Sequence, residues 1–192
     1  MPMPKTLVWV PVIAAILVLL SSYLYTTTSS HDSITTTTDN HYRMTGSQFQ
    51  LILREGITGG FAGPTVKKVI EIKGDSSSGA TLLHANLQPG TKADYVTQTG
   101  SVSTEQLTTL LSTVKEQLQS LPTEDPIGSE DIYGLDTSIL FFADGFQWGN
   151  GGPEGCTGGE STKQATPEQK QIFATLVELI STFGTQYATT AA

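Results

Sequence analysis

Two apolar segments of this chain are separated by the glycine-rich stretch Arg54-Glu55-Gly56-Ile57-Thr58-Gly59-Gly60-Phe61-Ala62-Gly63. Four of its ten residues are glycine, which frees the backbone to take positive φ angles and lets another chain approach closely. Phe61 is a large apolar side chain among residues too small to cover it. The stretch predicts either a hairpin turn whose Phe61 folds back onto a sheet, or a loop that contacts a partner.

The segments on either side of this stretch have the alternation of half-buried β-strands. In residues 48–54, apolar side chains stand at every second position, at Phe49, Leu51 and Leu53. The segment Thr65–Lys73 repeats the pattern, with Val66, Val69 or Ile70, and Ile72 as its apolar side, and its lysines are expected to face outward. We therefore expect the two segments to pair as a hairpin.

Further strands are indicated downstream of this hairpin. Residues Asp75–Gly79 (DSSSG) have turn composition, and the runs Thr81–Leu87 and Ala93–Val102 follow as two candidate strands. Residues Ser138–Trp148 read as two short apolar strands around Asp144-Gly145, which is a strong hairpin signal. This last hairpin is expected to complete the sheet.

A first amphipathic helix is predicted after Val102. Ser103 and Gln106 have the spacing of a capping box, in which each side chain bonds to the other residue's backbone N–H. The apolar stripe that follows has helical spacing and consists of Leu107, Leu110, Leu111, Val114 and Leu118. Leu121-Pro122 ends the helix, because proline disfavours helical geometry in the residue before it.

A second helix is predicted near the carboxyl end of the chain. Thr166 and Gln169 again form a capping box, now with Pro167 at the first helical position, and Gly184 is expected to end the helix. Its predicted inner face carries Ile172, Phe173, Leu176, Val177, Ile180 and Phe183. The element order predicts an α+β domain: a mainly antiparallel sheet with two amphipathic helices packed on one face.

The segment between the first helix and the last hairpin is rich in carboxylates: Glu124, Asp125, Glu130, Asp131 and Asp136. Calcium would be the natural ligand of such a cluster, but the spacing does not match an EF-hand loop. A solvated acidic loop is therefore the favoured interpretation, and no metal site is predicted. His31, Asp32 and His41 lie in a polar segment and are also read as solvated.

No catalytic arrangement is recognisable in the sequence. The glycine-rich run 149–163 suggests a phosphate-binding loop, but it has no Gly-Lys-Ser/Thr sequence. Cys156 would need a basic partner to act as a nucleophile, and His84 is the only histidine in the predicted domain. We therefore expect a protein that is not an enzyme and that needs no cofactor, with an enzyme built on Cys156 or the acidic loop as a minor alternative.

The amino end carries an uncharged apolar run, Leu7–Tyr25. As a helix its length is about 28 Å, close to the thickness of the bilayer interior. A retained membrane anchor is favoured over a cleaved signal peptide, because no clean cleavage site follows the run. Lys5 before the run places residues 1–6 in the cytoplasm and the rest of the chain outside it; cleavage would make the protein secreted. Residues 26–46 then form a threonine-rich stalk, followed by a single extracytoplasmic domain at 47–187.

Charge and cysteine content narrow the classes of partner. The net charge is −8, from ten basic and eighteen acidic residues, and nucleic-acid binding needs a basic surface. Cys156 is the single cysteine, so no disulfide can form within the chain. The domain must be stabilised by its core, and the expected partners are other proteins, plus a lipid bilayer through residues 7–25.

The order of these motifs over roughly residues 48–185 resembles the emfourin-type family, small domains that include protein inhibitors of protealysin- and thermolysin-like zinc metallopeptidases. The resemblance is carried by the glycine-rich stretch, by the helix opening at Ser103–Gln106 with its leucines, and by the Leu121-Pro122 exit. The hairpin around Asp144-Gly145 and the helix that begins at Thr166 complete it. In this chain Ile57-Thr58-Gly59 are inserted within the family's continuous Arg-Glu-Gly-Gly-Phe-Ala-Gly sequence.

The resemblance implies an inhibitor-like domain that binds an extracytoplasmic metallopeptidase. The alternative is a structural or adaptor domain at the cell surface that binds some other protein. In either case, the residues expected to contact the partner are Arg54, Glu55, Gly56, Gly59, Gly60, Phe61, Ala62 and Gly63.

Overall fold

The computed structural model describes residues 48–60, 63–151 and 159–189. Phe61 and Ala62, the predicted stalk and the predicted membrane segment lie outside these residues. Met44–Ala192 make up one compact unit of the chain.

A single six-stranded antiparallel sheet forms the frame of this unit, with the strand order β6-β5-β4-β1-β7-β8. A separate two-stranded ladder, β2-β3, lies beyond the end of β1. The strands are β1 (Gln48–Glu55), β2 (Gly59–Gly60), β3 (Gly63–Pro64), β4 (Lys68–Asp75), β5 (Gly79–Leu87), β6 (Tyr95–Val102), β7 (Thr137–Ala143) and β8 (Phe146–Gly149).

The central strand β1 joins the two halves of the chain. It pairs with β4 along its whole length, so the predicted hairpin is confirmed, although β4 begins at Lys68 rather than at Thr65. On its other side β1 pairs with β7, which comes more than eighty residues later. The Asp144-Gly145 hairpin thus extends the sheet beyond β1, with β8 as its outer strand.

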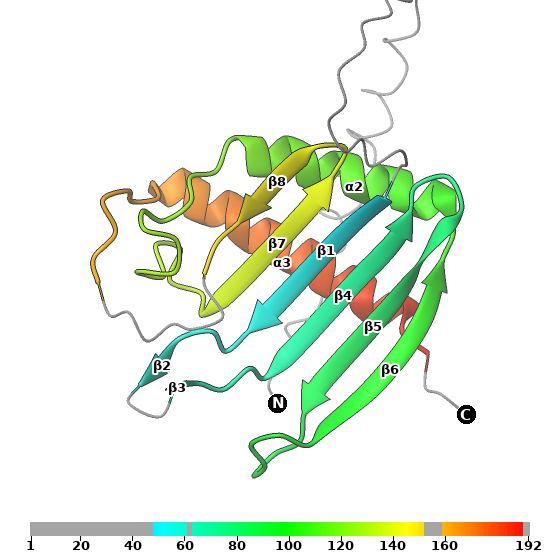
Figure 1. The fold of residues 1–192 in the computed structure, drawn as a ribbon, viewed down its shortest axis with the longest axis horizontal. Coiled ribbons are helices and arrows are strands. Elements are labelled where there is room, and N and C mark those ends of the chain that lie inside the picture. The colour runs from blue at the N-terminus through cyan, green and yellow to red at the C-terminus, as the bar shows by residue number, and fades with distance from the viewer. Residues whose placement is uncertain (1–47, 61–62, 152–158, 190–192) are drawn as a thin grey trace, which may run out of the picture. The chain divides into compact units, whose positions relative to one another are not determined.

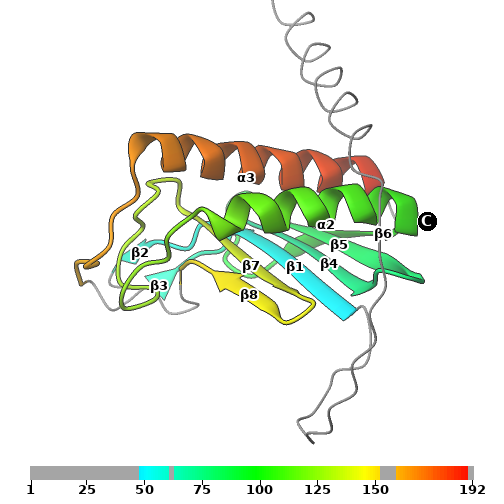
Figure 2. The ribbon, with the colours of Figure 1, turned by 90° about the horizontal axis from the view of Figure 1, so that it is seen from above.

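Both helices cover the same face of the sheet, here called the inner face (Figure 2). They are α2 (Thr104–Gln119) and α3 (Pro167–Tyr187). The predicted capping boxes are present: the Oε1 atoms of Gln106 and Gln169 accept hydrogen bonds from the backbone N–H groups of Ser103 (3.1 Å) and Thr166 (2.9 Å). An antiparallel sheet with two helices confirms the predicted α+β class.

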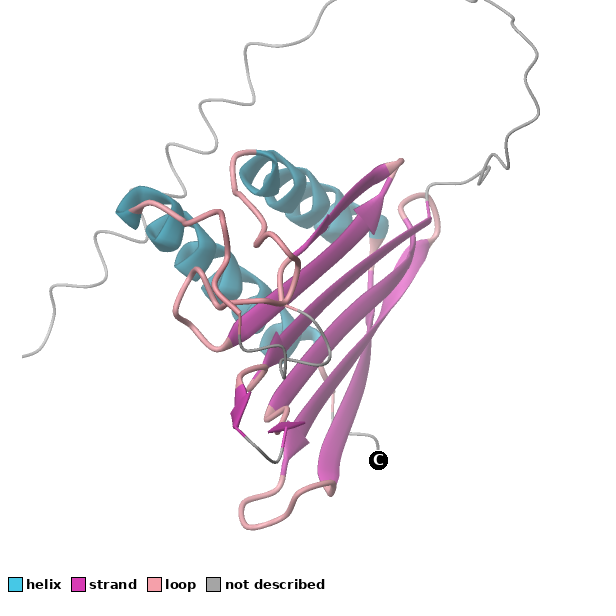
Figure 3. Ribbon diagram, turned by 60° about the vertical axis from the view of Figure 1, so that its left-hand side comes forward, coloured by secondary structure: helices cyan, strands magenta, loops and turns pink. Residues whose placement is uncertain are grey.

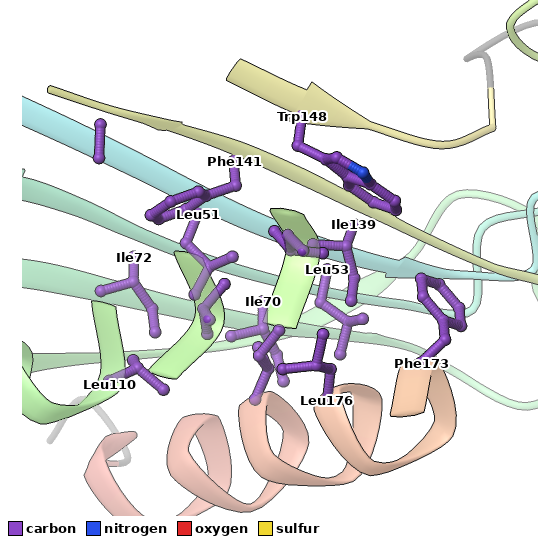
Figure 4. Close-up of a cluster of buried hydrophobic side chains, with 14 of the residues drawn as sticks. Leu51, Leu53, Ile70, Ile72, Leu110, Ile139, Phe141, Trp148, Phe173 and Leu176 are labelled. Carbon is purple, nitrogen blue, oxygen red and sulfur yellow. The ribbon is translucent and has the colours of Figure 1, made fainter. Parts of the chain in front are cut away.

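The core lies between the inner face and the two helices (Figure 4). Alternate residues of β1 and β4, such as Leu51, Leu53 and Ile70, point into it and are fully buried. The helices contribute Leu107, Leu110, Val114, Leu118, Phe173, Leu176 and Ile180. Leu111, which belongs to the predicted stripe, is only partly buried against this cluster, so Leu110 is the deeper position of the two.

The prediction that Gly184 ends the second helix is wrong, since α3 continues to Tyr187. Gly184 lies within the helix where it contacts β4: a Cβ atom at this position would come within 2.6 Å of Ile70 Cδ1. The glycine therefore lets the helix approach the sheet closely, and this packing outweighs its low helix propensity.

Candidate functional site

The glycine-rich stretch forms a small projection at one end of the sheet (Figure 1). Gly59 pairs with Pro64 and Gly60 with Gly63, which makes the β2-β3 ladder. Phe61 and Ala62 are outside the described residues, so the predicted role of Phe61 stays a prediction. We call the described part of this projection, together with loop 120–136 and the described residues 150–151 and 159–165 of loop 150–165, the loop end of the domain (Figure 3).

The residues that lead into the projection are fixed by the sheet. Arg54 lies in β1 between Val69 and Ser138, on the outer face that the helices leave uncovered. Glu55 forms an ion pair with Lys68, whose Nζ also donates to Ser181 of α3 at 3.2 Å. Gly56 has φ +88°, and a Cβ there would collide with the Thr65 carbonyl, so the turn needs glycine.

The two residues after Gly56 hold the base of the projection in place. Ile57 is buried, although it belongs to the insertion within the glycine-rich motif. Thr58 donates two hydrogen bonds to Asp136 Oδ1, from its backbone N–H and from its hydroxyl, both at 2.6 Å. The inserted residues thus tie the projection to a distant loop.

Asp136 is the residue that organises this contact. Its carbonyl oxygen accepts from the N–H of Gly56 at 2.8 Å, and its Oδ2 lies 3.5 Å from Lys67 Nζ. Partial burial disfavours the charge on Asp136, but the hydrogen bonds from Thr58 and the ion pair with Lys67 outweigh it, so the pKa lies below its usual value. The carboxylate is therefore ionised at neutral pH.

A second carboxylate holds Asp136 in turn. Asp136 has a left-handed backbone, with φ +53°, which aspartate tolerates better than most residues. Its N–H donates to Asp131 Oδ2 at 2.7 Å, while Asp131 Oδ1 accepts from the N–H of Gly134 at 2.9 Å. Loop 120–136, which binds the projection through Asp136, is thus folded around the side chain of Asp131.

The remaining acidic residues connect loop 120–136 to loop 150–165. Glu124 Oε1 accepts from the N–H of Gly151 at 2.6 Å, and burial raises the pKa of Glu124. Glu130 Oε2 accepts from the N–H of Ser161 at 2.9 Å and from the Gln164 amide at 2.8 Å. These bonds brace the two loops against each other.

The expectation of a solvated acidic loop is therefore wrong. The carboxylates of Glu124, Glu130, Asp131 and Asp136 accept hydrogen bonds from backbone N–H groups, and Glu124 is buried. Among the residues that the structure describes, no group of three or more His, Cys, Asp or Glu side chains could hold a metal ion.

Asn150 anchors loop 150–165 to the sheet. It is fully buried: its Oδ1 accepts from the N–H of Ile139 at 2.8 Å, and its Nδ2 donates to the Thr137 carbonyl at 2.9 Å. Its own carbonyl accepts from the Ser138 hydroxyl. The side chain thus continues the hydrogen bonding of β7 at the point where β8 has ended.

Of the two residues considered for nucleophilic chemistry, Cys156 lies outside the described residues. His84 is buried on the inner face of β5, where its Nε2 lies 3.2 Å from Asn86 Nδ2. Burial and the nearby Lys68 charge lower the pKa of His84. The His84 side chain is therefore neutral at pH 7, and it lies at the margin of the core.

Two apolar side chains are exposed at the loop end. Ile127 is 67% exposed at the tip of a turn, in which the N–H of Ser129 donates to the carbonyl of Pro126 at 3.1 Å. Leu135 is 41% exposed and immediately precedes Asp136. The loop end therefore combines a rigid polar base with exposed apolar groups, as protein-binding loops on a stable scaffold do.

Sequence reasoning missed Asp136, Thr58 and Lys67 as parts of this site. Lys67 lies in the segment that was expected to be strand, and Thr58 was counted only as an insertion. The one local signal for this contact was the carboxylate of Asp136, directly before the strand residue Thr137. Nothing in the neighbouring sequence indicates that Thr58 is its hydrogen-bond partner.

Comparison of the chain with family models, with curated proteins and with solved structures returns no match. In the part of the chain that the structure describes, no helix is both long and apolar enough to cross a membrane.

Proposed function

We propose that this domain is a protein-binding module whose contact surface is the loop end, and that it inhibits an extracytoplasmic thermolysin-like zinc metallopeptidase. The observation that carries the proposal is the fixed base of the glycine-rich projection. Gly56 and Thr58 donate hydrogen bonds to Asp136, and Asp136 donates one to Asp131, so the base of the projection is held in a fixed position.

Rigid presentation matters because binding by a flexible loop is weakened by the entropy lost on ordering it. The β2-β3 ladder and the carboxylate bonds supply that order before any partner arrives. The choice of a metallopeptidase rests on the resemblance of the motif order to the emfourin-type inhibitors.

We further propose that residues 7–25 anchor the protein in the membrane, with residues 1–6 in the cytoplasm and the domain outside. The support is the uncharged apolar run and the single lysine before it. Secretion after cleavage is the alternative. In either case the domain would meet its partner outside the cytoplasm.

A surface adaptor without a peptidase partner is the second candidate function. The exposed Ile127 and Leu135 favour it, because they would serve contact with any protein that has an apolar pocket. The two candidates share the loop end and differ only in the partner.

Thermolysin inhibition by residues 44–192 tests the first candidate. This segment is one compact unit with its own core, so it can be produced without the apolar run. We expect inhibition by the parent domain, and a loss of about 2 kcal/mol of binding free energy in Phe61→Ala with little change in melting temperature. The matched control is Phe142→Ala, which removes a phenylalanine that is exposed on the outer face of β7.

Two results would count against this assignment. A stability loss of about 3–5 kcal/mol in Phe61→Ala would show that Phe61 is a core residue rather than a contact. A parent domain that does not inhibit thermolysin would leave the adaptor as the remaining candidate.

A further inference from the structure

Glu124 carries a buried carboxyl group that the proposed function does not use. It is the only buried carboxylate in the described part of the chain, with 2% of the residue exposed. Its Oε1 accepts from the N–H of Gly151 at 2.6 Å, whereas its Oε2 is buried without a hydrogen-bond partner among the described residues. A buried charge is costly unless it is paired and hydrogen-bonded, so ionisation of this carboxyl group is unfavourable.

The charged and titratable groups around Glu124 do not compensate for its burial. On its own loop, the Asp131 carboxylate repels a negative charge on Glu124. Burial raises the pKa of Tyr133, so that hydroxyl stays neutral beside Glu124. On α3, the positive charge of Lys170 acts on Glu130.

Burial is the main influence on Glu124, and it raises the pKa of this carboxyl group. The Asp131 charge acts in the same direction. Hydrogen bonds from the N–H groups of Glu124 itself and of Gly151, which faces the carboxyl from loop 150–165, act in the opposite direction and are outweighed. Glu124 therefore takes up a proton more readily in the folded domain than in the unfolded chain.

Gly151 connects Glu124 to the base of the glycine-rich projection. It has φ +66°, and a Cβ atom there would lie 2.7 Å from Ile57 Cδ1, so the Ile57 side chain packs directly on a glycine backbone. Ile57 is buried and immediately precedes Thr58, whose hydrogen bonds to Asp136 fix the projection. The Glu124 carboxyl, the Gly151 backbone and the Ile57 side chain thus form a continuous series of contacts.

We propose that the protonation state of Glu124 controls how firmly the base of the glycine-rich projection is held. The protonated carboxyl stays buried and keeps Gly151 in contact with Ile57. When the proton is lost to solvent, the carboxylate gains more from hydration than from burial, and the contact loosens. The inference concerns regulation of the loop end, so its biological role rests on the proposed function, whereas its test does not.

The direction of the pH response follows from the raised pKa. The contact is complete below the unfolded pKa of 4.5 and is lost as the pH rises through the higher folded value. Asp136 responds in the opposite direction, because folding lowers its pKa. The base of the projection is therefore held most firmly at a pH between the folded pKa values of Asp136 and Glu124.

The proposal is tested by NMR titration of residues 44–192 from about pH 3.5 to about pH 8. Three signals are followed: the carboxyl carbon of Glu124, the amide of Gly151 and the Cδ1 methyl of Ile57. We expect all three to change with one midpoint above 4.5. The Ile57 methyl is the critical signal, because it lies on the projection and carries no titratable group.

Glu124→Gln removes the titrating group and keeps an oxygen that can accept from Gly151, so the shared transition should disappear from Gly151 and Ile57. Glu130→Gln is the matched control. Glu130 joins the same two loops through the N–H of Ser161 at 2.9 Å, and this bond lowers its pKa, so the variant should keep the transition. The titration of the parent needs no variant and still decides if Glu124→Gln does not fold.

Four results would overturn the proposal. The Glu124 carboxyl could titrate at or below pH 4.5, or the Ile57 methyl could stay unchanged while Glu124 titrates. The transition at Ile57 could also persist in Glu124→Gln, or vanish in Glu130→Gln. The titration uses the domain without any partner, so its outcome is independent of the thermolysin assay.

Discussion

The inner face of the sheet and the loop end are stabilised by different interactions. The inner face is apolar, and residues such as Leu53, Leu107 and Phe173 are fully buried by the two helices. At the loop end, single carboxylates accept hydrogen bonds from backbone N–H groups of neighbouring loops. Burial of apolar area is non-directional, whereas a hydrogen bond depends on the position of one atom.

The two regions therefore contribute differently: the inner face to the stability of the domain, and the loop end to the geometry of its loops. Apolar packing provides most of the free energy of folding and tolerates small changes of shape. The carboxylate bonds fix the geometry of the loops at a smaller gain in free energy, because each replaces a bond to water. Substitutions in the two regions should therefore differ in the size of their effect and in their response to pH.

The largest effect is expected at the inner face. Leu110→Asp places an unpaired charge in the core and should cost about 4 kcal/mol or more, enough to unfold a domain of ordinary stability. Leu111→Asp, one position along α2, should cost much less because Leu111 is only partly buried. Urea denaturation followed by circular dichroism compares the two. Equal losses would mean that α2 does not pack through Leu110.

A smaller loss is expected for Asn150, the most buried polar group of the loop end. Asn150→Ala leaves the Ile139 N–H and the Thr137 carbonyl without their partner and should cost about 2–4 kcal/mol. Gln147→Ala, at an exposed position of β8, is the control and should be nearly neutral. If both variants unfold at the parent's urea concentration, Asn150 does not support the loop.

Asp136 should show a modest stability effect and a larger effect on binding. Asp136→Ala removes both hydrogen bonds to Thr58 and should cost about 1–2 kcal/mol, while loosening the glycine-rich projection. Asp136→Asn keeps an oxygen acceptor and tolerates the left-handed backbone, so it should retain most of the stability. Thermolysin inhibition and thermal melting of both variants are to be compared.

The stability that Asp136 contributes should decrease as the pH falls. Its pKa is depressed in the folded protein, so its contribution to stability is full above the unfolded pKa near 3.8 and is lost as the pH falls through the lower folded value. Asp136→Ala should lack this part of the acid sensitivity. An identical acid response in parent and variant would argue that the Thr58 and Lys67 contacts do not stabilise the carboxylate.

The smallest effect is expected at His84, where a polar group lies at the margin of the apolar core. Its pKa is lowered by folding, so its stabilising contribution is full above the unfolded pKa of 6.5 and is lost as the pH falls through the folded pKa. The urea midpoint of the parent should therefore drop between about pH 7.5 and about pH 5. His84→Gln should show a smaller drop, and a larger one would contradict the assignment.

Local patterns were sufficient for most of the secondary structure. Alternation at Phe49, Leu51 and Leu53 specified β1, because one face of a strand must be apolar when helices cover it. The capping residues Ser103 and Thr166 marked the first turns of α2 and α3, because orphan backbone N–H groups there need acceptors. The α+β class followed from the order of these elements.

Features set by distant parts of the chain could not be read in this way. A glycine near the end of a helical pattern usually ends the helix, yet Gly184 lies inside α3, where it contacts Ile70. Loop 120–136 has the composition of a solvated loop, but its carboxylates accept hydrogen bonds from backbone N–H groups elsewhere in the chain. Asp136, for example, accepts from Thr58, which is 78 positions away. Periodicity and capping are properties of neighbouring residues, whereas the partner of a hydrogen bond across loops is decided only once the sheet has brought β1 beside β7.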